Sequence, residues 1–354
     1  MTAIAPIPFG RTPSGEQTRL YRLANAHGTT ADLTDYGACL VSLRVPDAHD
    51  GFVDVVMGYD GAAGYDGNAP QFGATIGRFG NRIAGATFEL DGIRYRLEAN
   101  ENGNSLHSGP AFWHHRVWDV VAAEQDDDGA SVTFALSSAD GDQGFPGALD
   151  VRVTYTLTAD NALSISYEAD AAASTPVNLT NHSYFNLNGH ASGTVLDHTL
   201  ALAASAYTAT DDALIPTGEL VDVSGTPMDL RGGRVLREGV ESSYPALVGA
   251  GGYDQNFALD PHDAATPVAT LTADKTGIVM DVFTDLPGIQ IYSGNFIGRE
   301  IGKGGAVYGN HEAVCLETQF FPDSVNQPTF EQPVFGPEKP YRTTTTYAFR
   351  TATA

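Results

Sequence analysis

The sequence predicts an all-β protein, a large antiparallel β-sandwich with few short helices. Short segments in which polar and apolar residues alternate recur along the chain, which is the pattern of half-buried strands. The 39 glycines and 19 prolines fall between these segments as turn formers, and no long amphipathic helix interrupts them. A chain of 354 residues without a linker or an internal repeat indicates one large core, so we expect residues 1–354 to form a single domain.

Individual strands and hairpins can be placed from this alternation. Residues 131–137 alternate strictly, as a strand with one buried face should. Two further pairs of alternating segments are each joined by a short polar turn. We expect hairpins there, 151–157 with 162–168 and 268–272 with 277–283.

Composition and charge exclude several classes of partner. The formal net charge is −24 and no basic patch is available to neutralise phosphates, so we expect no nucleic-acid partner. The only lysines are Lys275, Lys303 and Lys339, which argues against a phosphate-rich substrate. No apolar run reaches the roughly 20 residues of a membrane helix, and no signal-peptide pattern opens the chain, so we expect no membrane partner. Cys39 and Cys315 are typical of free thiols in a reducing compartment, which favours a cytoplasmic location.

Two polar loop clusters are candidate binding segments. The segment 77–85 places Arg78, Asn81 and Arg82 among glycines, where directional donors lie close to exposed backbone and suit sugar hydroxyls. Taken alone, this segment is more typical of a glycine-rich turn with solvated arginines. The segment 104–109 carries His107, and a single loop histidine is more often part of a hydrogen-bond network than catalytic.

Three further clusters interrupt the strand pattern. As a strand, residues 178–187 would place Asn178, Thr180, His182 and Tyr184 on one polar face, which indicates either a solvated edge or a polar cleft. Asp254 lies in the segment 252–257, which alone fits a polar turn equally well. Glu317 lies inside the apolar run 313–322, where burial would raise the pKa of its carboxyl group toward the range of a general base. The alternative is a strand with one solvent-exposed face, on which Glu317 would lie.

Metal and cofactor chemistry have no support in the sequence. The histidines are scattered, and His114 and His115 would point to opposite faces of a strand. The chain has no Gly-x-Ser-x-Gly elbow, no P-loop and no dinucleotide fingerprint. We therefore expect no metal site and no cofactor.

The five clusters, in this order, resemble the aldose 1-epimerase (galactose mutarotase) family. The resemblance runs from Tyr36-Gly37-Ala38 to Tyr347-Ala348-Phe349, nearly the whole chain. Further matching segments are 140–147, 215–218, 287–295 and 322–328. No single motif is sufficient for the resemblance. It rests on all of these motifs occurring in the same order as in the family.

The resemblance implies a galactose mutarotase-like β-sandwich with an open cleft across one sheet, no cofactor, and a small-molecule sugar as partner. Glu317 matches the general base and His182 the general acid. The positions that match the family's sugar-binding residues are Arg78, Asn81, Arg82, His107, Asp254 and Gln290, and Tyr184 matches a position near the acid. We expect a monomer or homodimer that interconverts the α and β anomers of free aldohexoses such as galactose and glucose.

One segment departs from the family pattern. After His107 the family usually has Gly-aromatic-Asp-Lys, whereas this chain has Phe112-Trp113-His114-His115 with its spacing to Trp118 preserved. Either these aromatic residues form the rim of the cleft and select the sugar, or they pack into the core beside Trp118.

Two other functions stay open at this point, a sugar-phosphate mutarotase of the same fold and a non-catalytic carbohydrate-binding relative. A glycosidase would need a second carboxylate, for which Asp254 is the only candidate.

Overall fold

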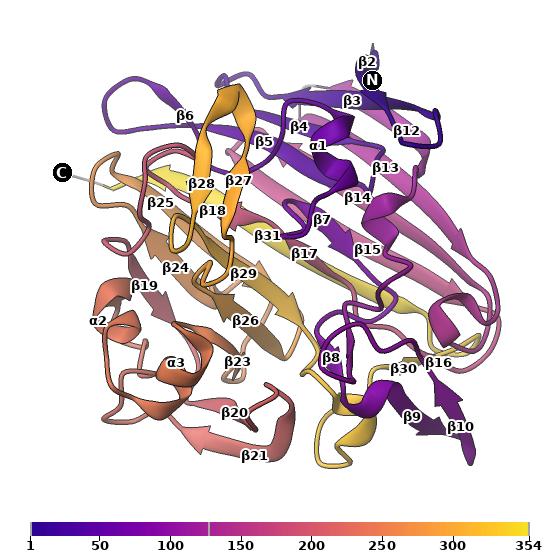
Figure 1. Cartoon of the computed structure of the whole chain (residues 1–354). Helices are drawn as coiled ribbons and strands as arrows, with labels where there is room; N and C mark the ends of the chain where they lie inside the picture. The colour runs from indigo at the N-terminus through magenta and orange to yellow at the C-terminus, as the bar shows by residue number, and fades with distance from the viewer. Residues whose placement is uncertain (1, 127, 353–354) are drawn as a thin grey trace.

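The computed structural model describes residues 2–126 and 128–352 (Figure 1). Within these residues the regular secondary structure is almost entirely β-strand, which confirms the predicted all-β class. The α-helices there are three and short, as expected: α1 (Ala62–Asp66), α2 (Leu236–Val240) and α3 (Pro245–Ala250). None of the helices in the described ranges is long and apolar enough to cross a membrane.

The first layer is a ten-stranded antiparallel sheet. Its strands, in spatial order, are β1 (Thr2–Ala3), β12 (Asp119–Asp126), β13 (Gly129–Ser138), β14 (Leu149–Thr158), β15 (Ala162–Ala171), β31 (Tyr341–Thr351), β25 (Ile278–Thr284), β24 (Ala269–Thr272), β19 (Thr199–Leu202) and β22 (Arg234–Val235). Both predicted hairpins are present, because β14 pairs with β15 and β24 with β25. The predicted strand 131–137 lies within β13, whose Val132 and Phe134 are buried.

Two smaller sheets form the second layer. The six-stranded sheet has the order β18 (Tyr184–Phe185), β29 (Val314–Gln319), β26 (Gly288–Tyr292), β23 (Asp254–Ala258), β20 (Ala206–Thr210) and β21 (Pro216–Asp222). The five-stranded sheet has the order β2 (Ile7–Arg11), β3 (Gln17–Ala24), β4 (Thr30–Thr34), β5 (Cys39–Pro46) and β6 (Phe52–Asp54).

One continuous apolar core joins the layers. It contains Phe134 and Tyr155 from the ten-stranded sheet, Leu33 from the five-stranded sheet, and Ile289 and Leu316 from the six-stranded sheet. A buried hydroxyl also links two layers, because Tyr347 Oη of β31 donates a hydrogen bond of 3.0 Å to the carbonyl oxygen of Leu316 in β29. Sharing one core fixes the six-stranded sheet firmly against the large one.

The six-stranded sheet has one apolar and one polar face. In β29, Leu316 enters the core, whereas Glu317 points to the opposite face, as the two-residue period of a strand requires. The neighbouring strands repeat this alternation in register, because Glu317 pairs with Gln290 and Gln290 with Asn256. The polar face turned away from the core is therefore built by side chains of three adjacent strands.

Short strand pairs and loops cover this polar face. β17 (Thr180–His182) pairs with β7 (Ala74–Ile76), and β8 (Arg82–Ile83) pairs with β11 (Ser105–Leu106). The second pair places Arg82 opposite Leu106, and thereby brings the predicted loop clusters at 77–85 and 104–109 together. The remaining pairs are β9 (Thr87–Leu90) with β10 (Ile93–Arg96), β16 (Thr175–Pro176) with β30 (Val334–Phe335), and β27 (Arg299–Ile301) with β28 (Val307–Gly309).

Candidate active site

A cleft of about 270 Å³ lies over the polar face of the six-stranded sheet. This volume is near the lower end of the range for ligand pockets and suits a small molecule. Side chains of the sheet and of the covering loops line it: Ala69, Pro70, Gln71, Asn81, Arg82, Glu101, Leu106, His107, His182, Tyr184, Asp254, Gln290, Tyr292, Phe296, Ile297, Glu300 and Glu317. The structure thus brings together every predicted site residue except Arg78.

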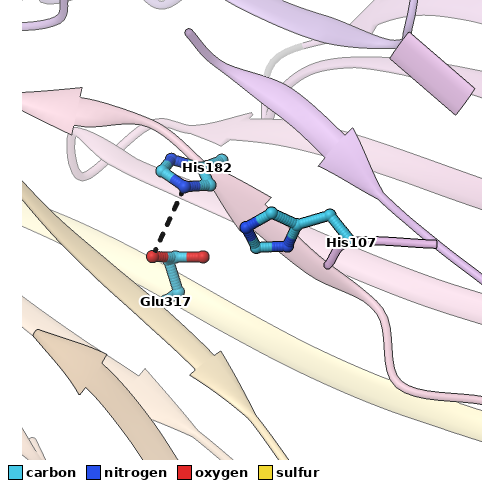
Figure 2. A group of neighbouring side chains, drawn as sticks. All are labelled: His107, His182 and Glu317. Carbon is cyan, nitrogen blue, oxygen red and sulfur yellow. Dashed lines mark ion pairs between the residues drawn. The ribbon is translucent and has the colours of Figure 1, made fainter. Parts of the chain in front are cut away.

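His182 and Glu317 face each other within the cleft, from β17 and β29 respectively (Figure 2). The distance from Nε2 of His182 to Oε1 of Glu317 is 3.7 Å. Both side chains are buried, and Oε2 of Glu317 has no hydrogen-bond partner among the described residues. One carboxylate oxygen is therefore free for a ligand while the other faces a histidine.

Burial shifts the pKa values of this pair in opposite directions. It raises the pKa of Glu317 well above its usual value, and the nearby carboxylate of Asp254 adds to the rise. Burial also lowers the pKa of His182 to about 4. Because each group disfavours its charged form, the pair tends to hold one proton between its two members. A group pair of this kind can act as acid and base in the same cleft.

Asp254 and Gln290 continue the polar row on the adjacent strands. Nε2 of Gln290 donates a hydrogen bond of 2.7 Å to Oδ1 of Asp254, which orients both side chains. Burial raises the pKa of Asp254, and the positive charge of Arg82 opposes this rise. Oε1 of Gln290 is buried without a partner among the described residues, so it is a second acceptor available to a ligand.

Loop residues supply donors on another side of the cleft. Arg82 forms a bidentate ion pair with Glu101, with two contacts of 2.7 Å. Burial lowers the pKa of Arg82, but Glu101 and the carboxylates of Asp254 and Glu317 outweigh it, so the net pKa is raised. The guanidinium therefore stays positively charged beside the carboxylates.

His107 has a fixed tautomer when it is neutral. Its Nδ1 accepts a hydrogen bond of 3.0 Å from the backbone N–H of Asn81, so the ring proton is on Nε2. Burial lowers the pKa of His107 well below its usual value, which keeps the ring neutral. The side-chain oxygen of Asn81 accepts a hydrogen bond of 2.9 Å from the backbone N–H of Arg82. Asn81 and His107 are thus presented to the cleft as N–H donors.

The same tautomer bears on metal binding. His107, His182 and Glu317 offer ligand atoms that lie within 4.8 Å of one another. A histidine ligates a metal through an unprotonated nitrogen, whereas Nδ1 of His107 is already occupied by an amide and Nε2 carries the proton. The arrangement favours a hydrogen-bond donor over a third metal ligand.

Tyr184 and Cys315 support the ring of His182. The rings of His182 and Tyr184 are stacked, with centroids 5.1 Å apart and planes inclined by 19°. Sγ of Cys315 lies 3.5 Å from Nδ1 of His182, and both cysteines of the chain are free thiols. Packing on one side and the thiol behind it hold Nε2 toward Glu317.

The prediction that Arg78 binds sugar is not supported by the structure. Its side chain is fully buried outside the cleft. The guanidinium donates hydrogen bonds to the carbonyl oxygens of Pro146 and Gly147, at 2.9 and 2.8 Å, and to the hydroxyl of Ser138 at 2.7 Å. Both terminal nitrogens of Arg78 are thus used by loop and strand atoms outside the cleft, and Nε is buried without a partner among the described residues, so the side chain joins segments of the chain together.

The Phe112–His115 segment also lies outside the residues that line the cleft. Trp113 is buried and its ring meets that of Trp118 edge to face, with centroids 5.8 Å apart. A Cβ atom at Gly77 would approach the Trp113 ring to 2.2 Å, so this close packing requires glycine there. Trp113 therefore packs into the core beside Trp118 and does not form the rim of the cleft.

Several cleft residues were not identified from the sequence. Tyr292 is two residues from Gln290 on β26, so the alternation of that strand is the signal that would have found it. Glu101 is recognisable only through its ion pair with Arg82. Gln71, Phe296 and Glu300 belong to covering loops and to β27, where no periodic pattern marks them.

Comparisons with known proteins agree with this architecture. The family model for aldose 1-epimerase matches residues 19–348. The chain is 39% identical to human galactose mutarotase over 353 residues, covering 99% of this chain and 100% of the relative. It is 38% identical to aldose 1-epimerase of Escherichia coli strain K12, covering 95% and 96% of the two chains.

Solved structures show the same fold. An aldose epimerase homologue from C. elegans superposes with a TM-score of 0.87 at 30% identity, covering 95% of this chain and 100% of that one. A galactose 1-epimerase from Lactobacillus acidophilus superposes with a TM-score of 0.86 at 23% identity, and both chains are fully covered. The match of the family model and the full-length relatives together establish that the chain belongs to the aldose 1-epimerase family.

Proposed function

We propose that this chain is an aldose 1-epimerase that interconverts the α and β anomers of free aldohexoses such as galactose and glucose. The observation that carries the proposal is the buried pair of Glu317 and His182, with Nε2 and Oε1 3.7 Å apart in the cleft. The anomeric oxygen and the ring oxygen are both bonded to C1, so a base and an acid that act on them must lie close together.

The reaction follows from these two positions. The pair reacts in the form in which its one proton is on His182. The carboxylate of Glu317 then takes the proton from the C1 hydroxyl, and protonated His182 gives a proton to the ring oxygen. The bond between C1 and the ring oxygen breaks, which leaves an open-chain aldehyde. After rotation about the C1–C2 bond, the hydroxyl re-attacks the carbonyl from the other face while both proton transfers reverse. Each positioned acid or base typically contributes about 10²–10⁴-fold to the rate.

The cleft supplies partners for a polyhydroxylated ligand. Asn81, Arg82 and His107 present N–H donors, whereas Asp254 and Gln290 present acceptors. We assign these five side chains to sugar binding and Tyr184 to the orientation of His182. Each hydroxyl can both donate and accept, so a mixed set of donors and acceptors suits a sugar.

A phosphorylated sugar is the less favoured substrate. Arg82 already forms a bidentate pair with Glu101, and both terminal nitrogens of Arg78 donate to carbonyl and hydroxyl oxygens outside the cleft. Neither arginine offers a free fork to a phosphate group. A non-catalytic sugar-binding role is disfavoured as well, since binding alone has no use for a desolvated carboxylate opposite a histidine.

The same proposal covers the working form of the protein. We propose that residues 1–354 act as one unit, since the apolar core includes side chains from Tyr21 to Phe349. We further propose a cytoplasmic monomer or homodimer without a cofactor. Size-exclusion chromatography with light scattering distinguishes the two oligomeric states.

The proposal is tested by polarimetry on freshly dissolved α-galactose and α-glucose. The wild-type protein should accelerate the approach to the equilibrium rotation, and His182→Asn should lower kcat by at least about 10²-fold. His198→Asn is the control, because His198 is also a buried histidine and lies outside the residues that line the cleft. Wild-type turnover in His182→Asn, with the fold checked by circular dichroism, contradicts the assignment.

A further inference from the structure

Gln71 is a cleft residue to which no role has been assigned above. It lies in the loop between α1 and β7, is 7% exposed, and lines the same cleft as His182 and Glu317. The loop is fixed by its backbone, since the N–H of Gln71 donates to the carbonyl of Asn68 at 2.9 Å. Its carbonyl oxygen accepts the N–H of Ala74 at 3.1 Å. The side chain of Gln71 takes no part in these bonds.

The side-chain oxygen of Gln71 is a buried acceptor without a partner. Oε1 is buried and makes no hydrogen bond to any described residue, although the residue lines the cleft. Leaving a buried acceptor unpaired is unfavourable, so such an atom in a cleft indicates a partner that is bound part of the time. Oε1 of Gln290 and Oε2 of Glu317 are unpaired in the same cleft. All three atoms are acceptors, which matches a ligand rich in hydroxyl donors.

A purely local role for the side chain does not explain this position. Gln71 has a φ of +61°, in the left-handed region that glycine and asparagine adopt more readily than glutamine. The neighbouring Phe72 does the packing, because its ring meets that of Tyr184 edge to face at 4.9 Å. The backbone conformation at residue 71 would favour glycine, and the side-chain oxygen forms no hydrogen bond to the loop or to any other described residue.

We propose that Gln71 is a further sugar-binding residue, whose side-chain oxygen accepts a hydrogen bond from one hydroxyl of the bound aldose. This inference rests on the proposed function of the cleft. The amide is neutral, so it binds a hydroxyl without adding charge beside the pair of Glu317 and His182. A contact of this kind is the same before and during ring opening, and therefore contributes to KM and leaves kcat unchanged.

Two substitutions separate binding from structure. Gln71→Gly removes the side chain at a position whose backbone suits glycine, so its Tm should be equal to or above that of the wild type. Gln71→Asn keeps an amide and tolerates the left-handed conformation, but its oxygen falls one methylene short. Both variants should raise KM for the aldose about 2- to 10-fold at unchanged kcat, the size of one uncharged hydrogen bond.

A series of monodeoxy sugars identifies the hydroxyl. Galactose lacking one hydroxyl at a time, at C2, C3, C4 or C6, is assayed by polarimetry with wild type and with Gln71→Gly. For the sugar that lacks the partner hydroxyl, the difference in kcat/KM between wild type and variant should disappear. For the other sugars the same difference should persist.

The outcomes keep the two proposals apart. If the wild type does not catalyse mutarotation, the proposed function fails. If it does, and both Gln71 variants keep the wild-type KM for galactose and glucose, the inference about Gln71 fails alone. A lower Tm of Gln71→Gly at unchanged KM would show that the side chain is structural and would also overturn the inference.

Discussion

Replacing Glu317 by glutamine should inactivate the protein and stabilise it at the same time. The side chain is 2% exposed, one carboxylate oxygen has no partner among the described residues, and Asp254 adds like charge. Glutamine has nearly the same shape and no charge. The substitution therefore removes the base and an unfavourable buried charge together, without creating a cavity.

The loss of activity follows from the role of the base. Removing a positioned general base costs about 10²–10⁴-fold in kcat, or about 3–5 kcal/mol of transition-state stabilisation. The amide of glutamine can still accept a hydrogen bond from the C1 hydroxyl but cannot take its proton. KM should therefore change far less than kcat.

The gain in stability can be estimated from the unpaired oxygen. An unsatisfied buried polar group costs about 1–3 kcal/mol, more when it is charged. For 354 residues, an unfolding entropy of about 2.1 cal/mol/K per residue gives about 0.7 kcal/mol/K. The Tm of Glu317→Gln at pH 8 should therefore rise by about 1–4 °C.

The pH dependence of this gain has a definite sign. The pKa of Glu317 is raised in the folded protein, so the folded state holds this proton more tightly than the unfolded state. Its favourable contribution is complete below the unfolded pKa and is lost as pH rises through the folded pKa. The stabilising effect of Glu317→Gln should therefore shrink toward zero near pH 4.

Calorimetry and polarimetry on the same preparations test this reasoning. Glu168→Gln is the matched control, because Glu168 lies on the ten-stranded sheet outside the cleft and should alter neither Tm nor kcat appreciably. A variant that keeps more than a tenth of the wild-type kcat would refute the role of Glu317 as base. A Tm below that of the wild type at pH 8 would refute the unfavourable burial of its charge.

Three other predictions follow from the geometry. Because burial lowers the pKa of His182 to about 4 and raises that of Glu317, kcat/KM should stay flat around neutrality and fall below about pH 4, where the pair takes up a second proton. A fall centred near the ordinary histidine pKa of about 6.5 would contradict this. Arg78→Lys should destabilise the fold by about 2–4 kcal/mol in calorimetry while KM for galactose changes less than about twofold, since its fork binds backbone carbonyls. A large rise in KM at unchanged Tm would restore Arg78 to the sugar site. Finally, kcat/KM for glucose 6-phosphate should be below that for glucose in polarimetry, because Arg82 is committed to Glu101; the reverse order would favour the sugar-phosphate alternative.

Strand-borne site residues were predictable from the sequence because strands have a simple period. A glutamate flanked by apolar residues in 313–322 had to lie on the face opposite Leu316, and β29 places it there. The same reasoning, applied to 178–187 as one strand, placed His182 and Tyr184 on a polar face. Both line the cleft, but from two separate strands, β17 and β18, and Asn178 and Thr180 do not line it. Alternation specifies the face of a side chain, and the hydrophobic effect specifies which face is buried.

Loop residues were not predictable in the same way. Arg78 and Arg82 belong to one glycine-rich segment, yet Arg82 lines the cleft and Arg78 is buried among carbonyl oxygens. Local sequence does not specify which distant carbonyls a loop arginine will meet, because Pro146 and Gly147 are far along the chain. Gln71 had no signal at all, since a single glutamine after a proline fits no pattern.

The division of the site between sheet and loops also has an evolutionary consequence. Asn256, Gln290 and Glu317 are register partners on three adjacent strands. A one-residue insertion in β26 would turn Gln290 into the core and Ile289 or Ile291 out of it, so folding and chemistry would fail together. Descendants of this chain should therefore keep these strands free of insertions and deletions.

Residues on the covering loops are under no such constraint. Gln71, Asn81 and His107 reach the cleft from segments whose length and composition can change without shifting the strand register. New sugar preferences can therefore arise by loop variation while the proton-transfer chemistry is inherited intact. The fold leaves substrate choice free to vary through its loops, whereas an insertion or deletion in the catalytic strands would cost folding and reaction together.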